Sequence, residues 1–167
     1  MSMIGCFRRL GGSDLEKLLA EPRLIFDYLD AVEEAEGFGP FADLDVDKAW
    51  HGIHYLLTGT AWDGSPPLNF IVAGGHQVGD EDVGYGPARG FYPDEVKVLA
   101  AALDATEAKS LASRFDPDAM ARAELYPDIW LQEGDEALEY LVDNLEALRD
   151  FVSGASKAGE GLLVYLT

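Results

Sequence analysis

The sequence predicts a layered α/β domain, and three observations support this class. Short apolar runs typical of strands lie near both ends of the chain and in its middle. Longer amphipathic segments typical of helices separate these runs. No internal repeat, low-complexity tract or linker divides the chain. We therefore expect residues 1–167 to form a single domain, and a chain of this length buries about 70% of its unfolded surface on folding.

The first part of the chain is expected to form a strand and two helices. Met3–Leu10 predicts a strand because strand-forming residues dominate it. A glycine pair follows, and Ser13–Glu16 has the pattern of a capping box that opens a helix. Pro22 suits the first turn of a second helix. An apolar stripe supports this second helix: Leu24, Ile25, Tyr28, Leu29 and Val32.

Residues 43–59 concentrate more chemistry than any other segment, with two of the three histidines and one of the three tryptophans. We expect a helix here, capped by Asp45 and ended by Gly59 in a left-handed conformation. One arc of such a helix is apolar and is expected in the core: Val46, Ala49, Trp50, Ile53, Leu56 and Leu57. The opposite arc is polar and titratable, and it is the first candidate site: Asp47, His51, His54, Tyr55 and Thr58.

Turn residues and periodicity predict the remaining elements. The apolar run Leu68–Ala73 is bounded by prolines and glycines, which favours an interior strand. Six glycines between Gly74 and Gly90 give too much backbone freedom for a regular element, so a loop is expected. The other expected elements are a helix over Pro93–Ala105, a short helix capped by Thr106, a helix starting at Asp116, a long helix over Asp135–Ala155, and a strand over Gly161–Leu166.

The charge of the chain limits its ligands. Twelve lysines and arginines stand against 31 aspartates and glutamates, which gives a net charge of −19. A field of this sign repels nucleic acid and anionic membranes, so neither is expected as a partner, whereas a basic protein partner is favoured. The charge also fits a soluble protein from an organism with an acidic proteome. The single cysteine, Cys6, cannot form an internal disulfide, and no segment has the pattern of a secretion signal or a membrane span. A cytoplasmic location is therefore expected.

Three segments share part of the pattern of a metal or phosphate site. His51 and His54 lie three residues apart, one turn after Asp47, and could hold a divalent metal. The usual helical chelate has a spacing of four, so a hydrogen-bonded buried pair and a binding or acid-base role stay open as alternatives. The alternating aspartates of residues 43–47 lack the glycine and glutamate of a calcium loop, and residues 84–90 lack the spacing of a dinucleotide loop. We expect no metal and no cofactor.

Arg89 and two aromatic residues form the second candidate site. Arg89 is the only basic residue between Lys48 and Lys97, so it needs a partner, either an internal carboxylate or a ligand anion. Tyr85 lies on the same glycine-rich segment. Trp130 follows a proline after a helix, where it closes an edge of the core or lines a pocket.

Several segments together resemble the YfbM-like family of small bacterial proteins of unknown function. The longest matching motif is Asp45-x-Asp-Lys-Ala-Trp-His-Gly-Ile-His-Tyr-Leu-Leu-Thr-Gly59. The shorter ones are Met3-Ile-Gly-x-Phe-x-Arg9, Gly84-Tyr-Gly-Pro-Ala-Arg89, Phe115-Asp-Pro with Met120, Tyr126-Pro-x-Ile-Trp130, and Tyr140-Leu. The resemblance covers nearly the whole chain and implies a cytosolic, three-layer α/β/α sandwich around one mixed sheet. It implies no reaction, cofactor or catalytic residue.

The first class of function is a binding or interaction protein. Its cleft would be formed by the polar arc of the 43–59 helix, the Tyr85–Arg89 segment and Trp130. Arg89 would hold a small anionic ligand there, or the acidic surface would cover a basic protein partner. An acidic inhibitor or immunity protein that masks a basic toxin or nuclease surface is a sharper form of this class.

The second class is a small-molecule enzyme. His51 or His54 would act as general base, oriented by Asp47 or Tyr55, and Arg89 would anchor an anionic substrate. An enzyme needs these groups to open into one pocket. An interaction protein instead needs an exposed acidic or apolar face elsewhere.

Overall fold

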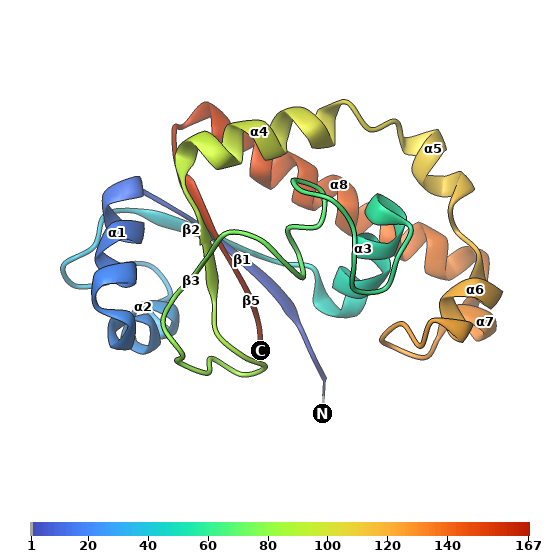
Figure 1. Ribbon diagram of the computed structural model, residues 1–167, viewed down its shortest axis with the longest axis horizontal. Coiled ribbons are helices and arrows are strands. Elements are labelled where there is room, and N and C mark those ends of the chain that lie inside the picture. The colour runs from blue at the N-terminus through green and yellow to red at the C-terminus, as the bar shows by residue number, and fades with distance from the viewer. Residues whose placement is uncertain (1) are drawn as a thin grey trace.

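A five-stranded sheet with helices on both faces forms the fold in the computed structural model, which describes residues 2–167 (Figure 1). In spatial order its strands are β2 Phe41–Asp45, β1 Gly5–Leu10, β5 Gly161–Leu166, β4 Arg89–Phe91 and β3 His76–Gln77. Every pair of neighbours is antiparallel. The α/β class is thus confirmed, but the expected mixed sheet is wrong. The reason is that β5 enters between β1 and β4 and runs against both of them.

Most helices lie where periodicity predicted them. The α-helices are α1 Gly12–Ala20, α2 Ile25–Asp30, α3 Trp50–Thr58, α4 Pro93–Asp104, α5 Ala108–Ser113, α6 Pro117–Arg122, α7 Trp130–Glu133 and α8 Asp135–Lys157. Two 3-10 helices, η1 Pro22–Leu24 and η2 Asp47–Ala49, precede α2 and α3. The expected start of α6 is confirmed, because the Asp116 carboxylate accepts the Ala119 N–H. Of the helices that the structure describes, none is both long enough and apolar enough to cross a membrane.

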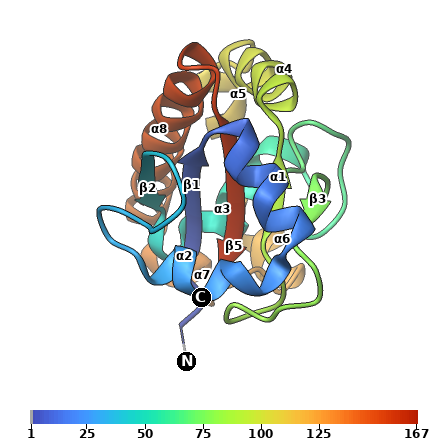
Figure 2. The same ribbon diagram turned by 90° about the vertical axis from the view of Figure 1, so that its left-hand side faces the viewer.

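Side chains alternate between the two faces of the sheet and build two hydrophobic clusters. On β1, Phe7 belongs to the larger cluster and Leu10 to the smaller one. On β5, Leu162 and Val164 belong to the larger cluster and Leu163 to the smaller one. Helices α1 and α2 cover the face of the smaller cluster, and α3 and α8 lie on the other side of the sheet (Figures 1 and 2). Both faces are therefore buried.

The helix expected over residues 43–59 forms only from residue 47, as η2 and α3, because residues 43–45 belong to β2, and no side chain of residues 2–167, that of Asp45 included, caps either helix. Helix α3 supplies the centre of the larger cluster. The Asp45 carboxylate accepts the Asp47 N–H at 3.1 Å, and Gly59 ends α3 with a φ of 75°. Every residue of the expected apolar arc is buried. A Cβ on Gly5 would lie 2.6 Å from the Trp50 Cβ, so β1 and α3 approach as closely as a glycine permits.

The segment Leu68–Ala73 does not form the expected strand. Its amides bond to carbonyls three or four residues earlier, as in Phe70 N–H to Pro67 O and Ala73 N–H to Asn69 O, so the chain makes tight turns. Two short strands, β3 and β4, form instead in the glycine-rich stretch where only a loop was expected. The strand β2 was not predicted because its side chains are largely exposed and give little apolar pattern.

Three expected end signals also differ in the structure. No side chain caps the start of α1, so the capping box of residues 13–16 does not form. Val32 is 84% exposed, because α2 ends at Asp30. The Thr106 hydroxyl donates to the Ala102 carbonyl at 2.8 Å and so bonds back to α4 instead of capping α5.

Replacing Trp50 by alanine is expected to lower the free energy of unfolding by about 3–5 kcal/mol, because a fully buried indole leaves a cavity. Urea denaturation measures this loss. Leu131 is 59% exposed and is the control, since Leu131→Ala should cost about 1 kcal/mol or less. Equal losses in the two variants would contradict the burial of α3.

Candidate functional site

His51 is sealed inside the structure and uses both of its ring nitrogens. Its Nδ1 accepts the Tyr126 N–H at 2.9 Å, and its Nε2 lies 2.8 Å from the Ala61 carbonyl oxygen. This network places the proton on Nε2, which donates to Ala61. The Trp62 ring lies over the imidazole with centroids 4.4 Å apart. Burial lowers the pKa of His51, so the ring is a neutral structural link between α3 and two loops.

His54 is fully buried one turn later. Its Nε2 lies 3.3 Å from the Thr58 hydroxyl, and its Nδ1 has no hydrogen-bond partner within residues 2–167. Burial lowers the pKa of His54 to about 4, so the ring is neutral at pH 7. The expectation that His51 and His54 face an open cleft is wrong, because the loop after α3 folds back over the helix.

A two-histidine metal chelate is not formed, since both nitrogens of His51 are occupied. Over the described part of the chain, no three His, Cys, Asp or Glu side chains are grouped to hold a metal ion. The absence of a metal in the protein stays a prediction.

Asp47 and Tyr55 do not orient either imidazole through a hydrogen bond in the described structure. The Tyr140 hydroxyl donates to Asp47 Oδ2 at 2.8 Å and accepts the Lys48 N–H at 3.1 Å, which ties the start of α3 to α8. Tyr55 is partly buried and packs against the larger cluster. These residues therefore act in the packing of α3.

Arg89 binds neither of the partners expected for it. Its guanidinium donates to four backbone carbonyls, those of Phe70 at 3.0 Å, Ile71 at 2.6 Å, Ala73 at 2.6 Å and Gly74 at 3.0 Å. Burial lowers the pKa of Arg89 to about 10. In a strand, these carbonyls would accept hydrogen bonds from a neighbouring strand. Here the Arg89 side chain donates to them instead, so residues 68–73 can form turns without leaving the carbonyls unpaired.

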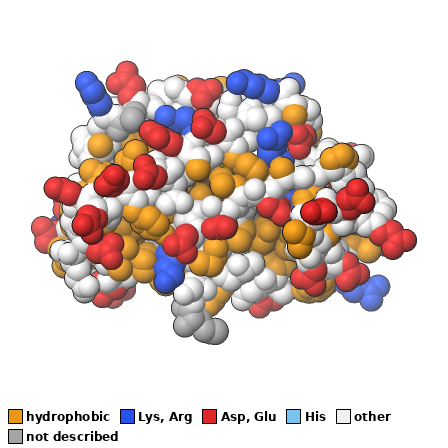
Figure 3. Space-filling view, turned by 180° about the vertical axis from the view of Figure 1, so that it is seen from behind, with side chains coloured by type: hydrophobic (Ala, Val, Ile, Leu, Met, Phe, Trp, Pro, Cys, Tyr) orange, Lys and Arg blue, Asp and Glu red, His pale blue; other side chains and the backbone are white. Residues whose placement is uncertain are grey.

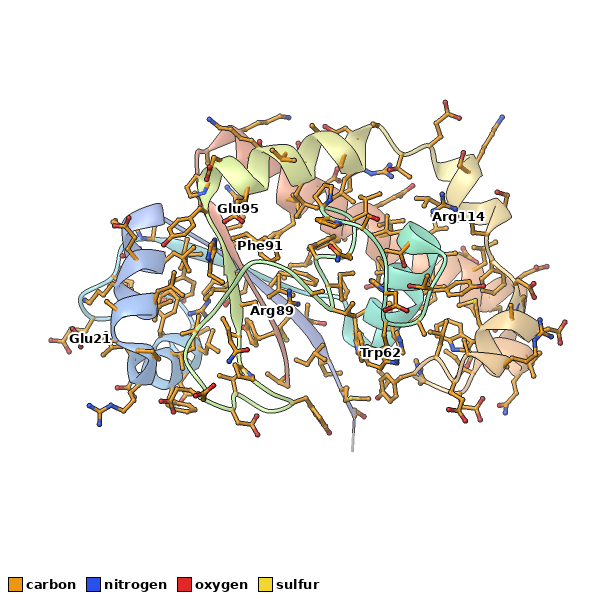
Figure 4. The ribbon with its side chains drawn as sticks, in the orientation of Figure 1. Glu21, Trp62, Arg89, Phe91, Glu95 and Arg114 are labelled. Atoms are coloured by element: carbon orange, nitrogen blue, oxygen red, sulfur yellow. The ribbon has the colours of Figure 1, made fainter. Side chains whose placement is uncertain are left out.

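Tyr85 lies apart from the histidines, whereas Trp130 packs against α3, since a Cβ on Gly52, next to His51, would lie 2.7 Å from Trp130 Cη2. Tyr85 is partly exposed on the turn before β4, where its N–H bonds to the Leu166 carbonyl. Trp130 is fully buried at the start of α7 and donates through Nε1 to the Leu125 carbonyl. Figure 1 shows α7 at the opposite end of the molecule from β3. Figure 4 likewise places Trp62 beside α3 and Arg89 on β4. The single cleft expected from these residues is not formed.

A different pocket lies between residues 66–75 and α4, with a volume of about 310 Å³. Its lining is mostly apolar and includes one carboxylate: Pro66, Pro67, Asn69, Gly74, Gly75, Phe91, Glu95, Val98 and Leu99. Figure 4 shows Glu95 near Phe91 where β4 passes into α4, with Arg89 farther along β4. Sequence reasoning missed this pocket because its wall was taken for an interior strand. The proline pair and the glycine pair that flank residues 68–73 were the available signal.

Arg89 is one of several cations that bind the protein's own backbone. The side chains that donate to backbone carbonyls are Arg8, Arg9, Lys17, Arg89, Arg114 and Arg149. Arg8 is 1% exposed and also pairs with Asp43, with Nε 2.6 Å from Oδ1. Half of the twelve lysines and arginines thus donate to the protein's own backbone, although only Arg8 among them is fully buried.

Comparison with known proteins gives a family and a fold. Residues 1–165 match the family model of a domain of unknown function, DUF1877. A solved structure of a protein of unknown function from Escherichia coli, YfbM, is similar to this chain, with a TM-score of 0.76 and 22% sequence identity. The similarity covers 98% of this chain and 99% of that one. A comparison with curated proteins found no match.

Acid is expected to destabilise the protein through His54. The folded state holds the pKa of His54 near 4 against 6.5 for a free histidine, so the unfolded chain binds more protons between these values. Stability is therefore complete above pH 6.5 and falls toward pH 4, by on the order of 3 kcal/mol for this group. Urea melts across this range should show a smaller pH slope for His54→Leu. Equal slopes in the unmodified protein and in His54→Leu would contradict the burial of a neutral His54.

Arg89→Ala is expected to lower the free energy of unfolding by about 2–4 kcal/mol, because four carbonyls lose a charged donor. Arg89→Lys should recover part of this loss. Arg23 is exposed, so Arg23→Ala is the control and should change stability by about 0.5 kcal/mol or less. An Arg89→Ala protein as stable as the unmodified chain would show that the loop does not depend on this side chain.

Proposed function

Since the chain belongs to the DUF1877 family of YfbM-like proteins, whose function is unknown, we propose from its own surface that it is an interaction protein. Its partner is a positively charged protein. The observation that carries this proposal is the excess of unpaired carboxylates, because half of the cations donate to backbone carbonyls and the 31 acidic residues outnumber all twelve cations.

The distribution of ion pairs supports the proposal. The described residues contain two arginine–carboxylate ion pairs, Arg8–Asp43 and Arg9–Glu160, and a His76–Glu95 hydrogen bond, against 31 carboxylate residues in the chain. Most carboxylates are therefore not paired internally. Figure 3 shows acidic side chains spread over the face seen from behind, where they outnumber the basic ones. Such a surface attracts a basic partner over a distance and disfavours an acidic one.

An acidic inhibitor or immunity protein is the sharpest form of this proposal, because it would mask a basic surface by complementary charge. The enzyme alternative has less support, since a general base must reach its substrate. His51 donates and accepts within the fold, and His54 is fully buried. A small anionic ligand has no free arginine at residue 89, where the guanidinium donates to four carbonyls.

The test begins with affinity purification of the tagged chain after cross-linking in its own cells. The partner recovered in stoichiometric amount is then purified, and the affinity of the two pure proteins is measured over a range of NaCl concentrations. We expect a partner with a positive net charge and an association rate that falls steeply as salt screens the charges. A neutral or acidic partner, a rate independent of salt, or the recovery of no partner would each contradict the proposal.

A further inference from the structure

The pocket between residues 66–75 and α4 has apolar walls from three separate segments. Phe91 is largely buried beneath it, and Val98 on α4 is 60% exposed. Pro66 and Pro67 form part of the opposite side. An apolar group that entered this pocket would remove these surfaces from water.

The wall of the pocket is held in place before any ligand arrives. Gly74 and Gly75 both have left-handed φ angles, 80° and 71°, and a Cβ on Gly75 would lie 2.8 Å from the Gly90 carbonyl oxygen. The wall therefore packs directly on β4, and the four hydrogen bonds from Arg89 fix its carbonyls. A site built in advance loses little conformational entropy on binding.

Glu95 is the one charged residue that lines the pocket, and its side chain is 37% exposed. Both hydrogen bonds that it accepts end on Oε1, from the Tyr92 N–H at 2.9 Å and from His76 Nε2 at 2.9 Å. Among residues 2–167 no group donates to Glu95 Oε2. One carboxylate oxygen therefore remains for a ligand beside an apolar surface.

We propose that this pocket receives a lysine side chain of the basic partner protein, with its aliphatic stem on the apolar walls and its ammonium on Glu95 Oε2. The inference rests on the proposed function and names its contact point. A lysine presents a point charge on a flexible apolar stem, which suits one free oxygen. An arginine prefers two carboxylate oxygens at once, and Oε1 already accepts two hydrogen bonds.

The experiment follows the methyl signals of Val98 and Leu99 by NMR during titration with short capped peptides. The probes are a peptide with one central lysine, the same peptide with norleucine, the same peptide with arginine, and free butylamine. The lysine peptide should perturb these signals at millimolar concentration and bind about fivefold or more tightly than each other probe. Norleucine lacks the charge, butylamine lacks the peptide backbone, and arginine prefers two free carboxylate oxygens.

Two variants and their matched controls locate the site. Glu95→Gln keeps an oxygen for the Tyr92 N–H but removes the charge and replaces Oε2 by an NH2 group, so the fold should persist while lysine-peptide affinity falls about fivefold or more. Val98→Lys places a cation at the pocket and should have a similar effect. Glu34→Gln and Val32→Lys make the same changes of charge at exposed positions outside the pocket and should leave the affinity within about twofold.

Each other result overturns the inference. Equal binding of norleucine would make the pocket purely apolar, tighter arginine binding would refute the choice of lysine, and equal butylamine binding would indicate a small-amine site. No perturbation by any probe would also refute it. A different result would contradict the proposed function, namely a partner protein whose association rate does not depend on salt. If the basic partner binds Glu95→Gln and Val98→Lys as tightly as the unmodified chain but remains sensitive to salt, the interaction protein stands and the lysine pocket does not.

Discussion

The fold depends on guanidinium groups that donate to backbone carbonyls. Arg8 contacts the carbonyl end of α2, Arg9 that of α8, and Arg114 that of α3, while Arg149 contacts Thr106 just beyond α4. Helix ends expose carbonyls without partners and carry partial negative charge, so a cation there satisfies both needs. Arg89 performs the same task for residues 70–74, which have no regular structure. The helices and the irregular wall are thus held by the same chemistry.

This use of arginine determines the electrostatic character of the surface. Arg89, Arg114 and Arg149 donate to carbonyls and pair with no carboxylate in the described structure, whereas Arg8 and Arg9 also pair with Asp43 and Glu160. The net charge of −19 therefore comes from carboxylates that outnumber the cations, most of them without a paired cation.

Periodicity predicted the parts of the fold that depend on local pattern. Strands β1 and β5 and helices α3, α4 and α8 lie where their apolar spacing indicated, because each buries one continuous stripe or face. The sealing of His51 and His54 could not be predicted, since it depends on the loop of residues 60–64 folding back over α3. In the sequence, the polar arc had the composition of a binding site. In the structure, loops cover this arc and form hydrogen bonds with its side chains, as buried polar groups require. The partners of Arg89 could not be predicted either. Every residue has a backbone carbonyl, so an arginine that binds carbonyls has no partner residue type that the sequence could reveal.

Charge and shape would act at different distances in the proposed interaction. The carboxylate surface acts over roughly 10 Å at moderate salt and sets how often a basic partner arrives. The pocket beside Glu95 acts only on contact, where a buried stem and one charge pair fix the register of the two surfaces. Arg89 links these two contributions. By donating to carbonyls it withholds a positive charge from the neighbouring acids, and it also holds the wall against which the partner would dock. Because one side chain serves both purposes, changes at Arg89 would alter stability and recognition together, whereas changes at Glu95 would separate recognition from folding.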